Sequence, residues 1–233
     1  MPDNKTNSSN GRPAVLLFDV NETLLDLSDM QQAVNKTFDN ELAFHLWFAL
    51  LLEYALVENV TDQYHTFSEV GQAVMKMTAE KIGQNVPEAK LKELVEMVNK
   101  TQPHPDVIPG LKKLKEAGFR LATLTNSPAK SSIPHLESVG LADYFEETFS
   151  VDSVKKFKPA SSPYQYAADQ LGIKLDNVMM VAAHGWDMAG ALRAGTRAAF
   201  ISRPGQALYP LAPKPELIAP TISDLADELV KMS

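Results

Sequence analysis

Short apolar runs alternate with helical segments from Leu111 to the end of the chain, and this alternation constrains the fold more than any other feature. Short apolar runs between turn signals are typical of strands, whereas apolar residues spaced three and four apart are typical of helices. We expect strands at 119–125, 147–151, 177–183 and 198–202, and helices at 111–117, 133–139, 163–171, 185–194 and 223–232. This order predicts a parallel sheet with helices on both faces, joined by right-handed crossovers.

The first strand of this sheet lies near the amino end, where Ala14 to Phe18 form an apolar run that is too short for a helix. Asp19 and a polar turn follow directly, so the strand carries a carboxylate at its carboxyl end. Open α/β sheets bind ligands at this end of their strands. The same pattern also fits a buried strand that ends in a capping residue and has no function. The polar residues that follow the other predicted strands distinguish these two interpretations.

The segment between the first strand and residue 101 has helical patterns and no convincing strand. The patterns lie at 30–40, 41–57, 66–82 and 87–99. We interpret 28–100 as an inserted all-helical cap, and 13–27 together with 101–233 as the α/β core domain. Residues 1–12 predict a disordered leader, and five prolines between 204 and 220 predict an extended surface segment.

The composition excludes several classes of function. A net charge of -7 favours neither nucleic acid nor an anionic membrane as a partner. The absence of cysteine excludes disulfides and thiolate chemistry, and the histidines lack the spacing of a zinc site. The polar amino end has no apolar centre of a secretion signal, and the apolar stretch around 46–52 is too short to span a bilayer. We therefore expect a cytoplasmic protein.

Polar blocks follow the predicted strands in a fixed order. They are Asp19, then Thr125-Asn126-Ser127, then Lys158-Pro159 before a helix, and last His184-Gly185-Trp186-Asp187. Because the carboxyl ends of parallel strands meet at one edge, we expect these blocks to lie together. Four such blocks, with a helical insert after the first, resemble the haloacid dehalogenase superfamily over nearly the whole chain after Pro13. The resemblance implies a Rossmann-like α/β core with an inserted helical cap.

The chemistry of these residues supports a covalent mechanism. A carboxylate such as Asp19 needs no base at neutral pH, and it gains reactivity when it is rigid and desolvated. Lys158 can lower the pKa of Asp19 and stabilise developing charge, while Asp187 could hold the ammonium in place. Thr125 and Asn126 supply neutral hydrogen bonds. The alternatives are a solvated surface lysine at 158 and a helix cap at 125 and 126.

Two positions distinguish the branches of the superfamily. The phosphatase branch has a second Asp two residues after the nucleophile, where this chain has Asn21, and an acid where it has Ala183. A Mg²⁺ site with so few carboxylates would be poor, whereas a halide leaving group needs neither a proton nor a metal. The chain therefore looks most like the type II L-2-haloacid dehalogenases, which work without a cofactor.

That resemblance implies hydrolysis of short 2-haloalkanoic acids. The Asp attacks the halogen-bearing carbon, and water then hydrolyses the resulting ester. Related enzymes are often dimers, so a homodimer stays open for this chain, with the apolar stretch 44–52 as a candidate interface; the sequence does not fix the oligomeric state. The supporting catalytic residues carried over by motif are Thr125, Asn126, Lys158, Tyr164 and Asp187. The implied substrate-binding residues are Val20, Asn21, Trp47, Phe48, Leu52, Phe67, Ser127, Tyr164 and Trp186. Four of these are equally compatible with ordinary core positions: Leu52, Phe67, Tyr164 and Trp186.

Two departures from the family pattern complement each other. Glu22 stands where the family usually has Gly, and His184 stands where it usually has Asn; a third departure puts Ala182 in place of a Ser. A carboxylate and an imidazole at one sheet edge make a general-base pair. We hypothesise that Glu22 orients His184, which activates water against the Asp19 ester. The alternative is a structural histidine.

Phe48 departs from the family in another way. The family commonly has an Arg there that receives the halide or the substrate carboxylate, and Phe cannot replace its bidentate contact. Either backbone amides after Asp19, the region 126–127 or another Arg binds the carboxylate, or the substrate is not a small haloacid. Two rival functions also stay open: a phosphomonoester hydrolase of the same fold, and a binding protein without turnover. The presence of both Asp19 and Lys158 argues against a binding protein, because only a catalytic function requires both residues.

Overall fold

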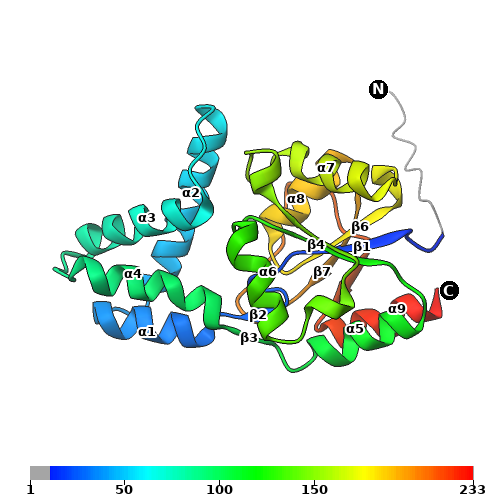
Figure 1. The fold of residues 1–233 in the computed structure, drawn as a ribbon, viewed down its shortest axis with the longest axis horizontal. Coiled ribbons are helices and arrows are strands. Elements are labelled where there is room, and N and C mark those ends of the chain that lie inside the picture. The colour runs from blue at the N-terminus through cyan, green and yellow to red at the C-terminus, as the bar shows by residue number, and fades with distance from the viewer. Residues whose placement is uncertain (1–10, 233) are drawn as a thin grey trace.

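Six short apolar segments pair side by side in one parallel sheet (Figure 1). The computed structural model describes residues 11–232, so nearly all of the predicted leader, 1–12, lies outside the described residues. The strand order is β5-β4-β1-β6-β7-β8. The strands are β1 (Val15–Phe18), β4 (Leu121–Thr125), β5 (Glu147–Ser150), β6 (Val178–Ala182), β7 (Arg197–Ile201) and β8 (Leu217–Ala219).

β1 lies between β4 and β6 near the middle of the sheet, which fixes where the first polar block emerges. Phe18 pairs in register with Thr123 of β4 and with Val181 of β6. All of β1 is buried, as expected for a parallel strand that is covered on both faces. The chain therefore leaves β1 at Asp19, beside the carboxyl ends of two neighbouring strands.

Helices cover both faces of the sheet, and alternate side chains of β1 point to opposite faces. Leu16 and Phe18 share a buried cluster with residues of α5 (Val107–Glu116) and α9 (Ile222–Lys231), while α6 (Ala129–Ser138) adds Leu136. Val15 and Leu17 share the opposite cluster with residues of α7 (Ser161–Leu171) and α8 (Gly185–Ala194). The predicted parallel sheet with helices on both faces is confirmed.

The helices between Ser28 and Glu96 gather to one side of the sheet (Figure 1). Their apolar side chains form a cluster of their own, which Val151 and Phe157 join from the core. A short antiparallel pair, β2 (Leu25–Asp26) and β3 (Gln102–Pro103), lies where the chain leaves and re-enters the core. The helices are α1 (Ser28–Phe38), α2 (Ala43–Val60), α3 (Phe67–Ile82) and α4 (Glu88–Glu96), followed by the 3₁₀ turn η1 (Met97–Lys100).

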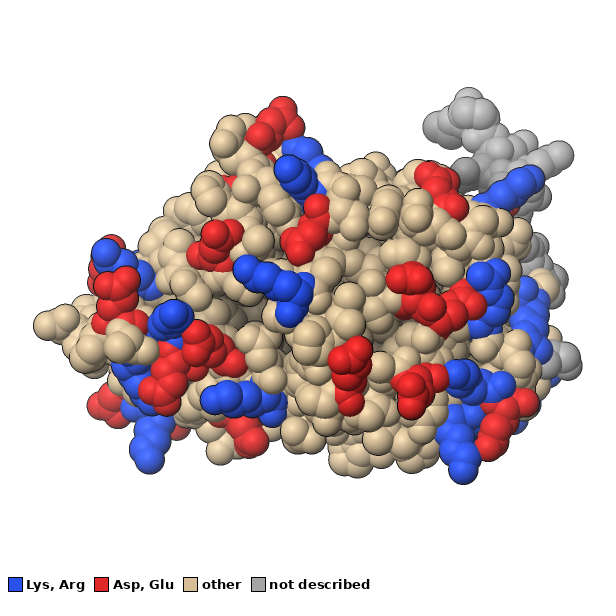
Figure 2. Space-filling model, viewed as in Figure 1, with Lys and Arg blue, Asp and Glu red and all other residues tan. Residues whose placement is uncertain are grey.

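α2 is the most apolar of these helices and extends past the others in Figure 1. By length and composition alone its 18 residues could cross a membrane, and a third of the helix is buried. Val60 at its end is 82% exposed. Core helices of soluble proteins meet the same criteria of length and composition, although they are mostly buried. Elsewhere on the face drawn in Figure 2, acidic and basic side chains are interspersed.

The segment 204–220 differs from its prediction. We expected only an extended surface segment, but Leu217–Ala219 form the edge strand β8, which pairs in parallel with β7. Pro215 and Pro220 flank this strand, and an edge strand tolerates proline because one of its sides makes no ladder bonds. Ala219 is buried. Three further short 3₁₀ turns complete the core: η2 (Ala142–Tyr144), η3 (Val151–Ser153) and η4 (Leu175–Asn177).

Candidate active site

Asp19 is a buried carboxylate with a hydrogen-bond partner on each oxygen. Its side chain is 7% exposed, and its backbone N–H donates to Val181 of β6. Oδ1 accepts from Lys158 Nζ at 2.9 Å, and Oδ2 accepts from the Thr23 hydroxyl at 2.7 Å. Nδ1 of His184 lies 3.2 Å from the same Oδ2. These contacts hold the carboxylate in one orientation.

Lys158 is a buried cation with three acceptors. Nζ donates to Asp19 at 2.9 Å, to Asp187 Oδ2 at 2.6 Å and to the Leu124 carbonyl at 2.9 Å. An ammonium has three donors, so each donor has a partner. Asn126 fixes the backbone, because its Oδ1 accepts from Lys158 N at 2.9 Å. The burial of Lys158 excludes the alternative of a solvated surface lysine.

The ion pair controls the charge of both partners. Burial alone would raise the pKa of Asp19, but the charge of Lys158 and the hydrogen bond from His184 hold it well below its usual range. Burial lowers the pKa of Lys158, and the charges of Asp187 and Asp19 more than offset this, so the pKa is raised. Asp19 is therefore ionised and Lys158 charged at neutral pH.

Asp187 accepts a hydrogen bond from the Lys158 ammonium, and Tyr164 in turn donates to Asp187. Asp187 lies in the first turn of α8, and Tyr164 on α7 donates its hydroxyl to Asp187 Oδ1 at 2.5 Å. Burial, followed by the charge of Asp187, raises the pKa of Tyr164 well above its ordinary value. The hydroxyl thus stays neutral and donates. Both side chains are fully buried.

His184 lies between two carboxylates and two aromatic rings. Nε2 is 2.7 Å from Glu22 Oε2, while Nδ1 faces Asp19. The ring stacks on Phe48 of α2 at 5.8 Å and on Trp186 at 5.2 Å between centroids. Burial lowers the pKa of His184, but the hydrogen bonds with Asp19 and Glu22 raise it to about 9.

The second polar block packs around Lys158 and the turn after Asp19. Thr125 Oγ1 accepts from Ser127 N at 3.1 Å, and the Ser127 hydroxyl accepts from Asn21 Nδ2 at 3.1 Å. The helix cap that we considered for 125 and 126 is wrong for this chain. The residue before α6 is Pro128, with no side-chain cap, and Asp152 accepts from the first helical N–H.

The remaining predicted residues lie in other surroundings. Trp47 donates its indole N–H to the Gly71 carbonyl at 2.9 Å inside the buried apolar cluster of helices α1 to α4. Phe67 packs on Phe157 with 5.6 Å between ring centroids, and Leu52 lies at the edge of the same cluster. Val20 is buried directly after Asp19. Of the four substrate-binding residues predicted between 28 and 100, Phe48 contacts His184, and the other three lie in or against the apolar cluster of α1 to α4.

Thr23 is a site residue that sequence reasoning missed. Its hydroxyl donates to Asp19 Oδ2 and accepts from the backbone N–H of Ala183 at 2.9 Å. It thereby joins the turn after β1 to the turn after β6. The available signal was a hydroxyl side chain four residues after the acid, immediately before an apolar pair.

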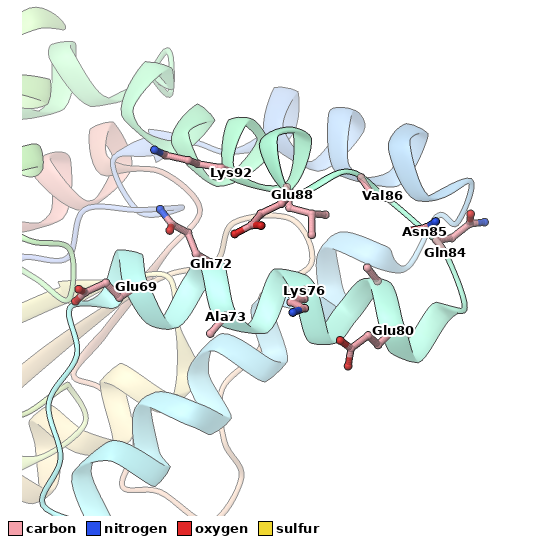
Figure 3. Close-up of a pocket in the computed structure, with 12 residues that line it drawn as sticks. Glu69, Gln72, Ala73, Lys76, Glu80, Gln84, Asn85, Val86, Glu88 and Lys92 are labelled. Carbon is pink, nitrogen blue, oxygen red and sulfur yellow. The ribbon is translucent and has the colours of Figure 1, made fainter.

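Two surface cavities lie near or beyond this site. A groove of about 490 Å³ runs between α3 and α4, and Figure 3 shows charged side chains of both helices around it, including Glu69, Lys76 and Lys92. None of the predicted site residues lines that groove. A cavity of about 540 Å³ reaches Trp186 and is also lined by Arg193 and Tyr209.

Comparisons with known proteins agree with this arrangement. A family model described as haloacid dehalogenase-like hydrolase matches residues 13–195. The chain is 25% identical over 217 residues to "(S)-2-haloacid dehalogenase H-109" of Pseudomonas putida, covering 92% of this chain and 97% of that one. It is 27% identical over 210 residues to "Haloacetate dehalogenase H-2" of Moraxella sp. (strain B), covering 89% and 93%.

Solved structures show the same fold. The structure of L-2-haloacid dehalogenase from Xanthobacter autotrophicus with chloropropionic acid covalently bound superposes with a TM-score of 0.87 at 22% identity. That match covers 95% of this chain and all of the other chain. The chain therefore has the same fold as that structure.

Proposed function

This chain belongs to the haloacid dehalogenase-like hydrolases, and we propose that it hydrolyses the carbon–halogen bond of short 2-haloalkanoic acids. The products are a 2-hydroxy acid and a halide ion. The observation that carries the proposal is the buried pair of Asp19 and Lys158, with 2.9 Å between Oδ1 and Nζ. A desolvated carboxylate that is kept ionised by a fixed cation is suited to act as a nucleophile.

In the first step, Asp19 attacks the carbon that carries the halogen. Among residues 11–232, Oδ2 has two hydrogen-bond partners, whereas Oδ1 accepts from Lys158 alone, so we assign Oδ1 as the attacking oxygen. The new Oδ1–carbon bond forms as the carbon–halogen bond breaks, and the electron pair leaves with the halide. Asp187 and the Leu124 carbonyl keep Lys158 in place during this step.

In the second step, water hydrolyses the ester at Cγ of Asp19. Oδ2 becomes the oxyanion, and the Thr23 hydroxyl is already 2.7 Å from it, as an oxyanion donor should be. We propose that His184, oriented by Glu22, removes a proton from this water. The distances of 3.2 Å from Nδ1 to Asp19 and 2.7 Å from Nε2 to Glu22 support these roles.

We assign substrate binding to groups that neighbour His184 and the turn after Asp19. We propose that Phe48 and Trp186 provide apolar contacts, because their rings flank His184. The turn Val20-Asn21 and Ser127 are joined by the hydrogen bond between Asn21 and Ser127. In place of the family's cap arginine, we assign the substrate carboxylate to the backbone amides of the turn after Asp19 and to the hydroxyl of Ser127.

Halide release from both enantiomers of 2-chloro- and 2-bromopropionate tests the proposal, with and without a chelator. We expect release from at least one enantiomer, unchanged by EDTA. Release of phosphate from a monoester only when Mg²⁺ is added, without halide release, would instead support the phosphatase rival. Absence of both activities, with no ester on Asp19, would support a binding protein.

The assembly and the location of the protein are separate proposals. We propose that the protein is located in the cytoplasm and forms a homodimer. We place α2 in the interface because Leu56, Val57 and Val60 leave apolar surface exposed on this helix. Light scattering after gel filtration tests the assembly. A dimer that Val60→Asp converts to a monomer would support it, and a monomeric parent protein would contradict it.

A further inference from the structure

Both ring nitrogens of His184 face carboxylate oxygens. Nδ1 lies 3.2 Å from Asp19 Oδ2, and Nε2 lies 2.7 Å from Glu22 Oε2. An ionised carboxylate accepts hydrogen bonds and donates none, so each nitrogen must carry a hydrogen to make its contact. The ring is therefore an imidazolium in the free enzyme. An imidazolium has no lone pair on either nitrogen and cannot act as a base.

We infer that esterification of Asp19 itself converts His184 from a proton-bearing partner of the nucleophile into the base that activates the hydrolytic water. This inference rests on the proposed function, because it needs the ester. The ester has no negative charge, so Nδ1–H loses its ionic acceptor. Glu22 keeps its charge and still holds Nε2–H, which leaves Nδ1 as the nitrogen that becomes free.

The other groups around the His184 ring also favour its neutral form once Asp19 is esterified. Lys158 Nζ lies beyond Asp19, 5.8 Å from the centre of the Trp186 ring, and esterification removes one of its two countercharges. Its positive charge then disfavours a second cation nearby. Phe48 and Trp186, which stack on the two faces of His184, carry no charge. Burial of the imidazole further disfavours its charged form.

The protons of the cycle balance. Alkylation of Oδ1 expels the halide with its electron pair, and the Nδ1 proton of His184 passes to solvent. Water then adds to Cγ while one of its protons goes to Nδ1. Collapse of the tetrahedral species breaks the Cγ–Oδ1 bond, and the second water proton ends on the 2-hydroxyl of the product. Asp19 is again a carboxylate, His184 is again protonated, and one proton has been released.

This order of events protects the histidine. A neutral imidazole is a nucleophile, so a neutral His184 beside a bound 2-haloacid could be alkylated in place of Asp19. The proton that Asp19 and Glu22 retain on the ring prevents this until the halide has left. The base thus becomes available only when the substrate carbon is already bound to Oδ1.

Asp19→Asn tests the inference without substrate, because the amide is an uncharged isostere of the ester. Titration of the His184 ring by NMR, assigned with His184→Asn, should give a pKa near 9 in the parent. We expect it to fall by at least about one unit in Asp19→Asn. Asp26→Asn is the matched control, since Asp26 faces His104 at 3.9 Å, and should leave the His184 pKa unchanged. An unchanged pKa in Asp19→Asn would overturn the inference.

A rapid-quench experiment on the parent enzyme separates this inference from the proposed function. A burst of halide together with an ester on Asp19 establishes the proposed chemistry, and absence of both refutes it. Given the ester, the inference expects its decay rate to rise with pH and to level off above an apparent pKa lower than that of the free enzyme. A decay rate that is independent of pH, or falls as pH rises, would overturn the inference and leave the proposed function standing.

Discussion

Glu22 and His184 lie 162 positions apart in the sequence, yet Glu22 Oε2 is 2.7 Å from His184 Nε2. Glu22 reaches this position with a backbone φ of 59°, in the left-handed region that favours glycine. A side chain in that region costs about 1 kcal/mol or more. The carboxylate is thus held at a strained position and directed at the imidazole, an arrangement suited to a functional contact.

Glu22→Gln should slow hydrolysis of the Asp19 ester by about a hundredfold or more, because general-base catalysis is typically of that size. The rate of ester formation should change little, because the hydrogen-bond partners of the Asp19 carboxylate are Lys158, Thr23 and His184, whereas Glu22 contacts His184. Quenched samples should therefore contain more esterified Asp19 peptide by mass spectrometry. Glu58→Gln removes a similar carboxylate from His65 on the surface, 3.0 Å away, and is the control. Equal ester levels in both variants would contradict the role of Glu22.

Lys158→Met should abolish alkylation and destabilise the fold by about 3 to 5 kcal/mol. The substitution leaves the carboxylates of Asp19 and Asp187 buried without their shared cation. Chemical denaturation measures the loss of stability, and single-turnover halide release measures the loss of chemistry. Lys112→Met, at an exposed lysine on α5, should change stability by less than about 0.5 kcal/mol. Full activity in Lys158→Met would show that another group activates Asp19.

Stability should fall as the pH rises from neutral, and His184 should account for part of the fall. Its pKa is about 9 in the folded protein, against an ordinary value of 6.5. The stabilisation from this raised pKa is complete below pH 6.5 and is lost as the pH rises through about 9. The shift corresponds to about 3 kcal/mol at most. Chemical denaturation between pH 6.5 and about 9 should show that the free energy of unfolding declines less steeply with pH in His184→Asn than in the parent protein. Identical pH profiles for the two proteins would contradict this contribution of His184.

Addition of Mg²⁺ or EDTA should leave halide release unchanged to within about a factor of two. The Lys158 ammonium lies between Asp19 and Asp187, so a resident cation already balances these acids. Residues 21 and 183 are Asn and Ala and add no further carboxylate. Halide release in metal-free buffer, followed by titration with Mg²⁺, measures this directly. Loss of activity in EDTA and recovery with Mg²⁺ would be the contrary result.

The architecture could be predicted from the sequence because its signals are local. Buried strands of a parallel sheet read as continuous apolar runs, and topology brings their carboxyl ends together. Asp19, Lys158 and Asp187 could thus be assigned to one edge without coordinates. Edge strand β8 escaped prediction because only three residues between prolines pair with β7.

Contacts that depend on the packing of distant elements could not be predicted in the same way. The Thr23 hydroxyl joins two turns that are 160 positions apart, and its sequence surroundings look like an ordinary turn. Phe48 stacks on His184 because α2 comes close to the turn after β6, a placement that helical periodicity does not specify. Trp47, one residue earlier, donates instead to the Gly71 carbonyl of α3.

The most direct test of the account follows solvent oxygen into Asp19. Multiple turnovers of a 2-haloacid in water enriched in oxygen-18 should label the Asp19 carboxylate, because each cycle returns a solvent oxygen to Cγ and releases Oδ1 with the product. Mass spectrometry of the peptide that contains Asp19 should show the label there. Label found in the 2-hydroxy acid after a single turnover, with Asp19 unlabelled after many, would mean that water attacks the substrate directly and would contradict the covalent mechanism.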